Sequence, residues 1–151
     1  MRQVRPYLFI GASVHPADVA RLQRSRITAI VSLQQAGIDL PVPAMDRMRA
    51  ACEPAIRFHN LGIADYNPDA VIAAAPDAVA LLDALIGAGH VVYLHCSEGI
   101  NRAPSIALAY LVRHERVDVD AAIAVLRACD AGARPYAGVI EWLRATAAAP
   151  R

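Results

Sequence analysis

The chain has 151 residues, which predicts a single domain covering residues 1–151. Its 15 Arg and 14 Asp plus Glu leave a formal charge of +1, and there is no Lys, so every fixed side-chain cation is a guanidinium. This near-neutral balance argues against a general nucleic-acid binder and against a polybasic membrane surface. Hydrophobic residues make up 56% of the chain, which excludes global disorder.

The cysteines and the apolar runs indicate the compartment. Cys52, Cys96 and Cys129 are an odd number without a CxxC pair, which fits neither a disulfide framework nor a zinc site. Free thiols are typical of a reducing compartment, so we expect a cytoplasmic protein that binds no metal. The apolar run before Gly11 is too short for a signal peptide. The most apolar region, residues 70–94, is interrupted by two aspartates and a histidine, so we expect no membrane-spanning helix.

Apolar periodicity and turn residues predict alternating strands and helices along the chain. In the N-terminal half, the expected elements are an edge strand at 7–10, a helix at 16–25, a buried strand at 27–33, a loop at 34–43, a helix at 44–52, a strand at 56–61 and a polar loop at 62–69. In the C-terminal half, they are a helix at 70–86, a strand at 91–94, helices at 103–114, 118–129 and 137–147, and a frayed tail at 148–151. This order predicts an α/β fold, with a central, mostly parallel sheet of about four to five strands flanked by helices.

The most informative stretch joins the central strand at 91–94 to the helix that follows it. Backbone amides at a helix N-terminus have no intrahelical partner, and the helix dipole adds positive potential there. The connecting loop is therefore predicted to bind an anion such as phosphate, sulfate or vanadate. Gly99 allows the loop to bend, and the planar Arg102 guanidinium can hold two phosphate oxygens. The predicted phosphate-binding residues are Ser97, Glu98, Gly99, Ile100, Asn101 and Arg102.

Cys96 lies at the floor of this predicted anion site. A thiol beside a helix N-terminus and a cation ionises more readily than a free one, so we expect a Cys96 thiolate. Such a thiolate is positioned for in-line attack on a bound phosphorus atom. The loop amides and Arg102 would stabilise the charge on the equatorial oxygens in the transition state.

The segment His95 to Arg102, HC-x5-R, resembles the signature of the cysteine-dependent protein tyrosine phosphatase superfamily. The chain as a whole resembles a compact dual-specificity phosphatase from residues 8–11 to the helical C-terminus. The resemblance implies a metal-independent protein phosphatase that needs no cofactor. It would hydrolyse phosphotyrosine and phosphoserine or phosphothreonine through a phosphocysteine intermediate.

The resemblance also implies a general acid about thirty residues before the cysteine, because an alkoxide or phenolate leaving group needs a proton. Asp65 lies 31 residues before Cys96 and matches that position, which predicts an acidic pH optimum. The alternative is Asp69, whose structural interpretation is an N-cap for the helix at Ala70. His95 is implied to order the signature loop, with a satisfied core histidine as the alternative.

Residues around the signature modify this prediction. Ala103 stands where the family commonly has Ser or Thr, whose hydroxyl helps the thiolate to leave, so we expect slower breakdown of the phosphocysteine. Ser97 is expected to contribute only its amide, and Glu98 to point outward. Asn101 either braces the loop or occupies a turn.

Several substrate classes are compatible with the signature. Besides a phosphorylated protein, a phosphoinositide or a phosphoglucan fits the same chemistry. Residues 99–102 also resemble RNA 5′-triphosphatases, but the near-neutral charge and the presence of Asp65 argue against a nucleic-acid substrate. A non-catalytic phospho-binding module usually lacks the equivalent of Cys96 or Arg102. Rhodanese-like sulfur transfer is disfavoured by the HC-x5-R spacing.

Overall fold

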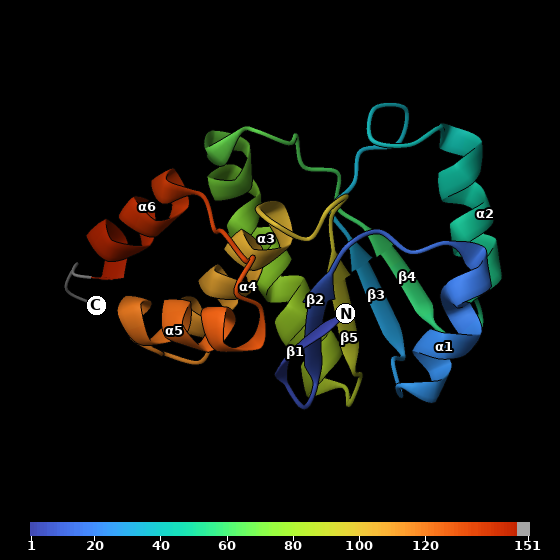
Figure 1. Cartoon of the computed structure of the whole chain (residues 1–151), viewed down its shortest axis with the longest axis horizontal. Helices are drawn as coiled ribbons and strands as arrows, with labels where there is room; N and C mark the ends of the chain where they lie inside the picture. The colour runs from blue at the N-terminus through green and yellow to red at the C-terminus, as the bar shows by residue number, and fades with distance from the viewer. Residues whose placement is uncertain (148–151) are drawn as a thin grey trace.

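The computed structural model describes residues 1–147 and has an α/β architecture (Figure 1). Its five-stranded sheet has the order β1-β2-β5-β3-β4. The strands are β1 (Arg2–Arg5), β2 (Leu8–Gly11), β3 (Ala29–Ser32), β4 (Arg57–Asn60) and β5 (Val92–His95). Strands β2, β5, β3 and β4 are parallel, and β1 is antiparallel to β2. The predicted α/β fold with a mostly parallel sheet is therefore confirmed; the frayed tail predicted at 148–151 lies outside the described residues.

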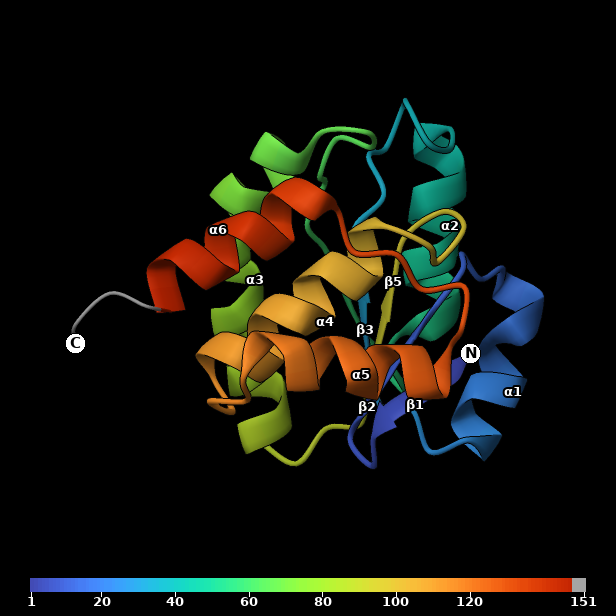
Figure 2. The ribbon, with the colours of Figure 1, turned by 60° about the vertical axis from the view of Figure 1, so that its left-hand side comes forward.

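Helices cover both faces of the sheet (Figures 1 and 2). One face carries η1 (Pro16–Asp18), α1 (Val19–Arg24) and α2 (Val42–Cys52), and the other carries α3 (Pro68–Gly87), α4 (Arg102–Arg113), α5 (Val119–Cys129) and α6 (Ala137–Ala147). Because strand side chains alternate between faces, β3 sends Ile30 to the first face and Ala29 and Val31 to the second. The sheet thus separates two apolar cores.

Strand β2 differs from the sequence prediction. It was expected at the edge of the sheet, and this is wrong, because β1 pairs with its outer side while β5 pairs with its inner side. The two residues between β1 and β2 form the turn of a hairpin, and Val4 of β1 is buried. The four-residue β1 was missed because Val4 is its one apolar residue.

Helix α3 begins at a different cap from the one considered in the sequence. The Asn67 side chain accepts a hydrogen bond from the Ala70 amide at 3.0 Å, so Asn67 is the N-cap and Asp69 lies inside the first turn. By length and composition alone, α3 could cross a membrane. One side of it packs into the core beside α4 and α6, as expected of the core helix of a globular domain. The buried residues on that side are Val71, Ala75, Ala78, Leu82 and Leu85.

The parallel strands determine where the functional loops meet. The carboxyl ends of β2, β5, β3 and β4 all lie at one edge of the sheet, at the top of Figure 1. The loops at 33–41, 61–67 and 96–101 follow β3, β4 and β5 at this edge. Ligand sites of open parallel sheets form at such an edge.

Candidate active site

The signature loop packs tightly against the end of β2. The Cys96 amide donates to the Gly11 carbonyl at 3.4 Å, and the Ser13 amide donates to the Ser97 carbonyl at 3.0 Å. Gly99 has a φ of 75°, and a Cβ atom there would lie 2.6 Å from the carbonyl carbon of Gly11. A larger residue at 99 would therefore meet backbone that cannot easily move.

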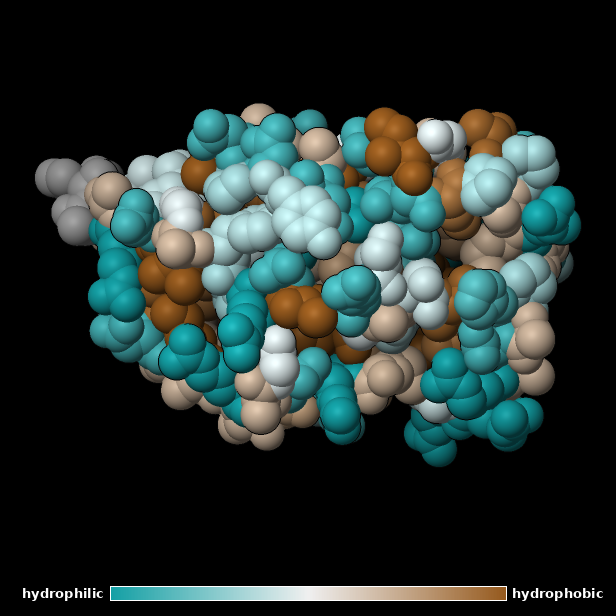
Figure 3. Space-filling model, turned by 45° about the horizontal axis from the view of Figure 1, so that its top comes forward, coloured by the Kyte–Doolittle hydropathy of each residue, from teal (hydrophilic) through white to brown (hydrophobic). Residues whose placement is uncertain are grey.

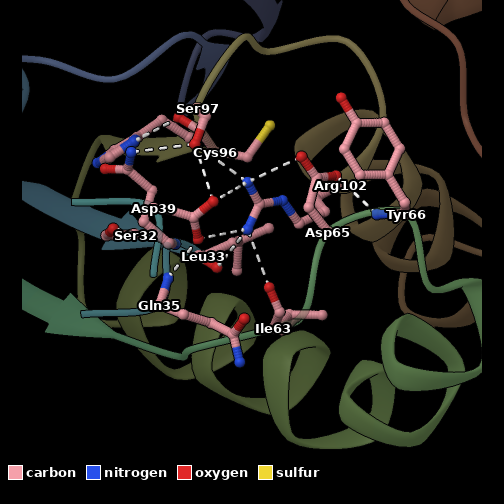
Figure 4. Close-up of polar contacts among 12 residues, drawn as sticks. Ser32, Leu33, Gln35, Asp39, Ile63, Asp65, Tyr66, Cys96, Ser97 and Arg102 are labelled. Atoms are coloured by element: carbon pink, nitrogen blue, oxygen red, sulfur yellow. Dashed lines mark hydrogen bonds and ion pairs between the residues drawn. The ribbon is translucent and has the colours of Figure 1, made fainter. Parts of the chain in front are cut away.

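Arg102, the first residue of α4, is held by an aspartate that the sequence analysis did not identify. Its Nη1 lies 2.9 Å from Asp39 Oδ2, and its Nη2 lies 3.0 Å from Asp39 Oδ1 (Figure 4). The side chains of Arg102 and Asp39 are 1% and 11% exposed, so this two-pronged ion pair is almost dry. Asp39 comes from the loop after β3, and its position after a parallel strand was the available signal.

Further contacts hold the guanidinium in a single orientation. Nη1 donates to the Ile63 carbonyl at 2.9 Å, and Nη2 donates to Ser97 Oγ at 3.1 Å and lies 3.3 Å from Asp65 Oδ2. Its Nε is buried and finds no acceptor among residues 1–147. Asp39 therefore occupies the end-on edge of the guanidinium, formed by Nη1 and Nη2. The side edge, which carries Nε, keeps one N–H without an acceptor.

The pair also shifts the pKa values of its members. Burial disfavours the ionised Asp39, but hydrogen bonds from Arg102 and from the Gln35 amide outweigh burial, and the pKa of Asp39 is lowered. Burial likewise opposes the charge on Arg102, whereas Asp39, Asp65 and Cys96 favour it, and the pKa of Arg102 is raised. Both groups stay charged throughout the neutral range.

Ser97 does more than the sequence predicted. Its hydroxyl accepts from Arg102 Nη2 and from Gln34 Nε2, at 3.1 and 3.2 Å, and donates to Asp39 Oδ1 at 3.3 Å. The expectation that Ser97 contributes only its amide is therefore wrong. Its side chain links the signature loop to the loop after β3.

The loop at 61–67 brings Asp65 to the same place, with its side chain 29% exposed. Asp65 Oδ2 faces Arg102, while Oδ1 accepts a hydrogen bond from the Tyr136 hydroxyl at 2.8 Å. The Tyr66 amide lies 2.9 Å from Oδ1 and 2.8 Å from Tyr136 Oη. Asp69, the alternative acid, is exposed in the first turn of α3.

Cys96 and His95 occupy the end of β5. Cys96 is 3% exposed and lies in the same cluster as Arg102 and Asp65 (Figure 4). The His95 ring is buried, stacks on Tyr93 at 5.5 Å, and its Nδ1 donates to the Cys96 carbonyl at 3.0 Å. Burial lowers the pKa of His95 to about 4, so the ring is neutral. Burial raises the pKa of the Cys52 thiol to about 11 and also raises the pKa of the Cys129 thiol.

The rest of the signature loop is braced by the segment between α5 and α6. The Arg134 amide donates to the Ile100 carbonyl at 2.7 Å, and Asn101 Nδ2 donates to the Arg134 carbonyl at 2.8 Å. Asn101 therefore braces the loop, one of the two roles considered for it. Glu98 is exposed, in agreement with its expected outward direction.

The structure brings Cys96 and Arg102, at the two ends of the signature loop, together with Asp65 from the loop at 61–67. It offers a thiol, a carboxyl group and a fixed cation at the N-terminus of α4, an arrangement suited to transfer of an anionic group. Within residues 1–147, no group of three or more His, Cys, Asp and Glu side chains is placed to hold a metal ion.

Comparisons with known proteins point to one family. Residues 22–148 match the family model described as the catalytic domain of dual specificity phosphatases. Human dual specificity protein phosphatase 2 is 29% identical over 124 residues, which are 80% of this chain and 35% of that protein. Human dual specificity protein phosphatase 1 is 26% identical over 124 residues, 80% of this chain and 30% of that protein. The chain thus spans about a third of the length of these relatives.

Solved structures show the same fold. The human tyrosine phosphatase-like serine/threonine/tyrosine-interacting protein superposes with a TM-score of 0.77 at 24% identity, covering 97% of this chain and 94% of that one. PTPMT1, solved in complex with PI(5)P, superposes with a TM-score of 0.79 at 15% identity, covering 96% and 92%. At these identities, the likeness establishes the fold.

Proposed function

The chain belongs to the dual specificity phosphatase catalytic domain family, and on that premise we propose that it is a metal-independent phosphatase acting through a phosphocysteine intermediate. Its proposed substrates are phosphomonoesters, with phosphotyrosine and phosphoserine or phosphothreonine in proteins as the first candidates. Cys96 is the proposed nucleophile, Arg102 the phosphate ligand and Asp65 the general acid. His95 is proposed to support the loop.

The observation that carries this proposal is the unsatisfied edge of Arg102. A buried N–H without an acceptor costs free energy, so native proteins rarely keep one unless a ligand or water satisfies it. Arg102 Nε is such a group, although Nη1 and Nη2 have several acceptors. A phosphate oxygen at the side edge would accept from Nε while Asp39 keeps the end-on edge. The amides of Ser97 to Asn101 would bind the remaining oxygens.

The proposed reaction has two steps. First, Cys96 Sγ attacks phosphorus, the S–P bond forms as the P–O bond to the leaving group breaks, and Asp65 gives its proton to the leaving oxygen. In the second step, Asp65 takes a proton from a water whose oxygen attacks phosphorus. The S–P bond then breaks and releases inorganic phosphate and the thiolate. Both transition states place charge on oxygens facing the loop amides and Arg102.

Hydrolysis of 4-nitrophenyl phosphate in EDTA tests the proposal. Cys96→Ser should abolish turnover. Asp65→Asn should lower turnover of phenyl phosphate by about 10²–10⁴, the worth of one acid–base group, with a smaller loss for 4-nitrophenyl phosphate, which has the better leaving group. The matched control is Cys129→Ser, because Cys129 is also a free thiol but lies at the end of α5, outside the loops that follow β3, β4 and β5. This variant should keep full activity. Full activity in Cys96→Ser, or a requirement for a divalent cation, would contradict the proposal.

The proposed breadth of substrate is based on the surface around the site. Three large apolar side chains are exposed on the loops at this edge: Ile38 at 75%, Tyr66 at 81% and Ile100 at 37%. Figure 3 shows this face, on which hydrophobic and hydrophilic side chains are interspersed. Phosphotyrosine, phosphoserine and phosphothreonine peptides should all be hydrolysed. Turnover of triphosphate-ended RNA but of none of these peptides would favour the RNA 5′-triphosphatase alternative.

A further inference from the structure

Tyr136 contacts the loop at 61–67, the acid loop, which carries Asp65. The reaction above does not use this contact. We infer that Tyr136 is a positioning residue for the general acid, and that it orients Asp65 so that Oδ2 is the oxygen that delivers the proton. The inference rests on the proposed function. It assigns a role to a residue between α5 and α6, outside the signature and the acid loop.

The directions of the hydrogen bonds are unambiguous. An amide can only donate and an ionised carboxylate can only accept, so the Tyr66 N–H donates to Tyr136 Oη, and the Tyr136 O–H donates to Asp65 Oδ1. Both distances are 2.8 Å. In such a chain each bond polarises the next, which strengthens the last bond to the carboxylate. Burial and this bond to Asp65 raise the pKa of Tyr136 to about 12, so the phenol keeps its proton.

The two oxygens of Asp65 are therefore not equivalent. Oδ1 receives the Tyr136 hydroxyl and also lies 2.9 Å from the Tyr66 amide. With two donors directed at it, Oδ1 is a poor place for a further proton. Oδ2 lies 3.3 Å from Arg102 Nη2, beside the signature loop. A proton on Asp65 is thus directed to the oxygen that faces the phosphate site.

Tyr136 is itself held firmly. Its amide donates to Ser105 Oγ at 2.9 Å, and Ser105 is completely buried in α4. At the start of α6, a Cβ on Gly138 would lie 3.2 Å from the Cβ of Pro68, so this helix end closely approaches the first turn of α3. The phenol thus reaches Asp65 from a rigid support.

The acid loop shows strain at the contact point. Tyr66 has a φ of 55°, in the left-handed region that costs a non-glycine residue about 1–2 kcal/mol. Such a conformation persists only where surrounding contacts hold it, and the hydrogen bond from the Tyr66 amide to Tyr136 is such a contact. Tyr136 therefore fixes both the backbone turn at Tyr66 and the side chain of Asp65.

The test compares Tyr136→Phe with Asp65→Asn and with the double variant, using phenyl phosphate and 4-nitrophenyl phosphate. Tyr136→Phe should lower kcat for phenyl phosphate by about 10-fold, the worth of one hydrogen bond to a charged group, with little change in KM. The loss should be smaller for 4-nitrophenyl phosphate, because its leaving group needs less protonation. In the Asp65→Asn background, Tyr136→Phe should cause no further loss.

Tyr7→Phe is the matched control, because Tyr7 also donates its hydroxyl to a carboxylate, that of Glu115, but lies between β1 and β2 away from the loop edge. Its activity should equal that of the wild type. An equal loss on both phosphates, or a full loss in the Asp65→Asn background, would overturn the inference.

A readout that does not depend on activity separates this inference from the proposed function. Hydrogen exchange of the Tyr66 amide should be slow in the wild type and in Tyr7→Phe and faster in Tyr136→Phe, because Tyr136 provides one of the two acceptors of this amide and holds the other, Asp65 Oδ1, in place. If the wild type hydrolyses phosphate esters no faster than Cys96→Ser, the proposed function fails while this exchange still tests the contact. Unchanged exchange in Tyr136→Phe would overturn the inference.

Discussion

Asp39→Asn would remove one negative charge from the centre of the site while keeping the shape of the side chain. In the structure, both oxygens of Asp39 face the Arg102 guanidinium, at 2.9 and 3.0 Å. In the variant, one oxygen becomes an amide NH₂ that meets another N–H donor. Arg102 would keep a single carboxylate neighbour, Asp65, at 3.3 Å.

The expected loss of stability follows from burial. Removing one partner of a buried ion pair costs about 3–5 kcal/mol, because the other charge is left uncompensated. Arg102 is 1% exposed, but Asp39 keeps 11% exposure and Asp65 remains nearby, so we expect about 3 kcal/mol, at the lower end. The matched control is Asp120→Asn. The Asp120–Arg144 pair is as short, at 2.7 Å, but 74% and 53% exposed, so its loss should stay below about 1 kcal/mol.

Urea unfolding of the wild type and both variants in phosphate-free buffer at pH 7 measures these losses. Since the pKa of Asp39 is lowered in the folded state, the charge contributes full stability above the ordinary value of 3.8, and this contribution is lost as the pH falls through the lower, folded value. The difference between wild type and Asp39→Asn should therefore be constant from pH 5 to 7 and shrink below about pH 4. A loss at pH 7 no larger than that of Asp120→Asn would refute the reasoning.

Three further predictions concern the signature. The pKa of His95 is lowered to about 4 in the folded state, so its neutral ring contributes fully to the free energy of unfolding above pH 6.5. This contribution, up to about 3 kcal/mol, is lost as the pH falls from 6.5 towards 4. Urea unfolding should show this fall in the free energy of unfolding in the wild type but not in His95→Asn. Gly99→Ala should lower the free energy of unfolding by about 3 kcal/mol, through backbone strain and the overlap of its Cβ with the Gly11 backbone. It should also prevent phosphate binding, as measured by calorimetry. Gly89→Ala, with a φ of 91° and no atom within 4 Å of its added Cβ, should cost only about 1–2 kcal/mol, and an equal loss in the two variants would disprove the overlap. Rapid mixing with 4-nitrophenyl phosphate should show a burst in the wild type that shrinks in Ala103→Ser; the absence of a burst would contradict slow breakdown of the phosphocysteine.

The sequence predicted the parts of the site that follow from local rules. A continuous apolar run before His95 predicts a central strand, and such a strand delivers Cys96 and Arg102 to a helix N-terminus. Asp65 follows β4 at the same edge. Asp39 obeys the same rule after β3 but was not identified, because its loop was interpreted only from its Gly and Pro residues.

Tyr136 could not be predicted in this way. It lies between two helices, and no strand end determines its position. It reaches the acid loop because α6 packs across α3, where Gly138 leaves room for Pro68. That approach depends on the packing of whole helices, which periodicity in the sequence does not specify. Strand β1 was missed for a related reason, because its place depends on pairing with β2 rather than on its own apolar pattern.

The charges gathered at the site explain why the proposed chemistry requires a protonated Asp65. Asp39 already balances the charge of Arg102, so a phosphate dianion meets no excess positive side chain and must be held by loop amides and the Arg102 Nε–H. An ionised Asp65 beside that dianion would repel it, so the productive complex needs the protonated carboxyl, which is also the form that can protonate a leaving group. The acidic pH optimum expected from the sequence is therefore required by the binding step as well as by proton transfer.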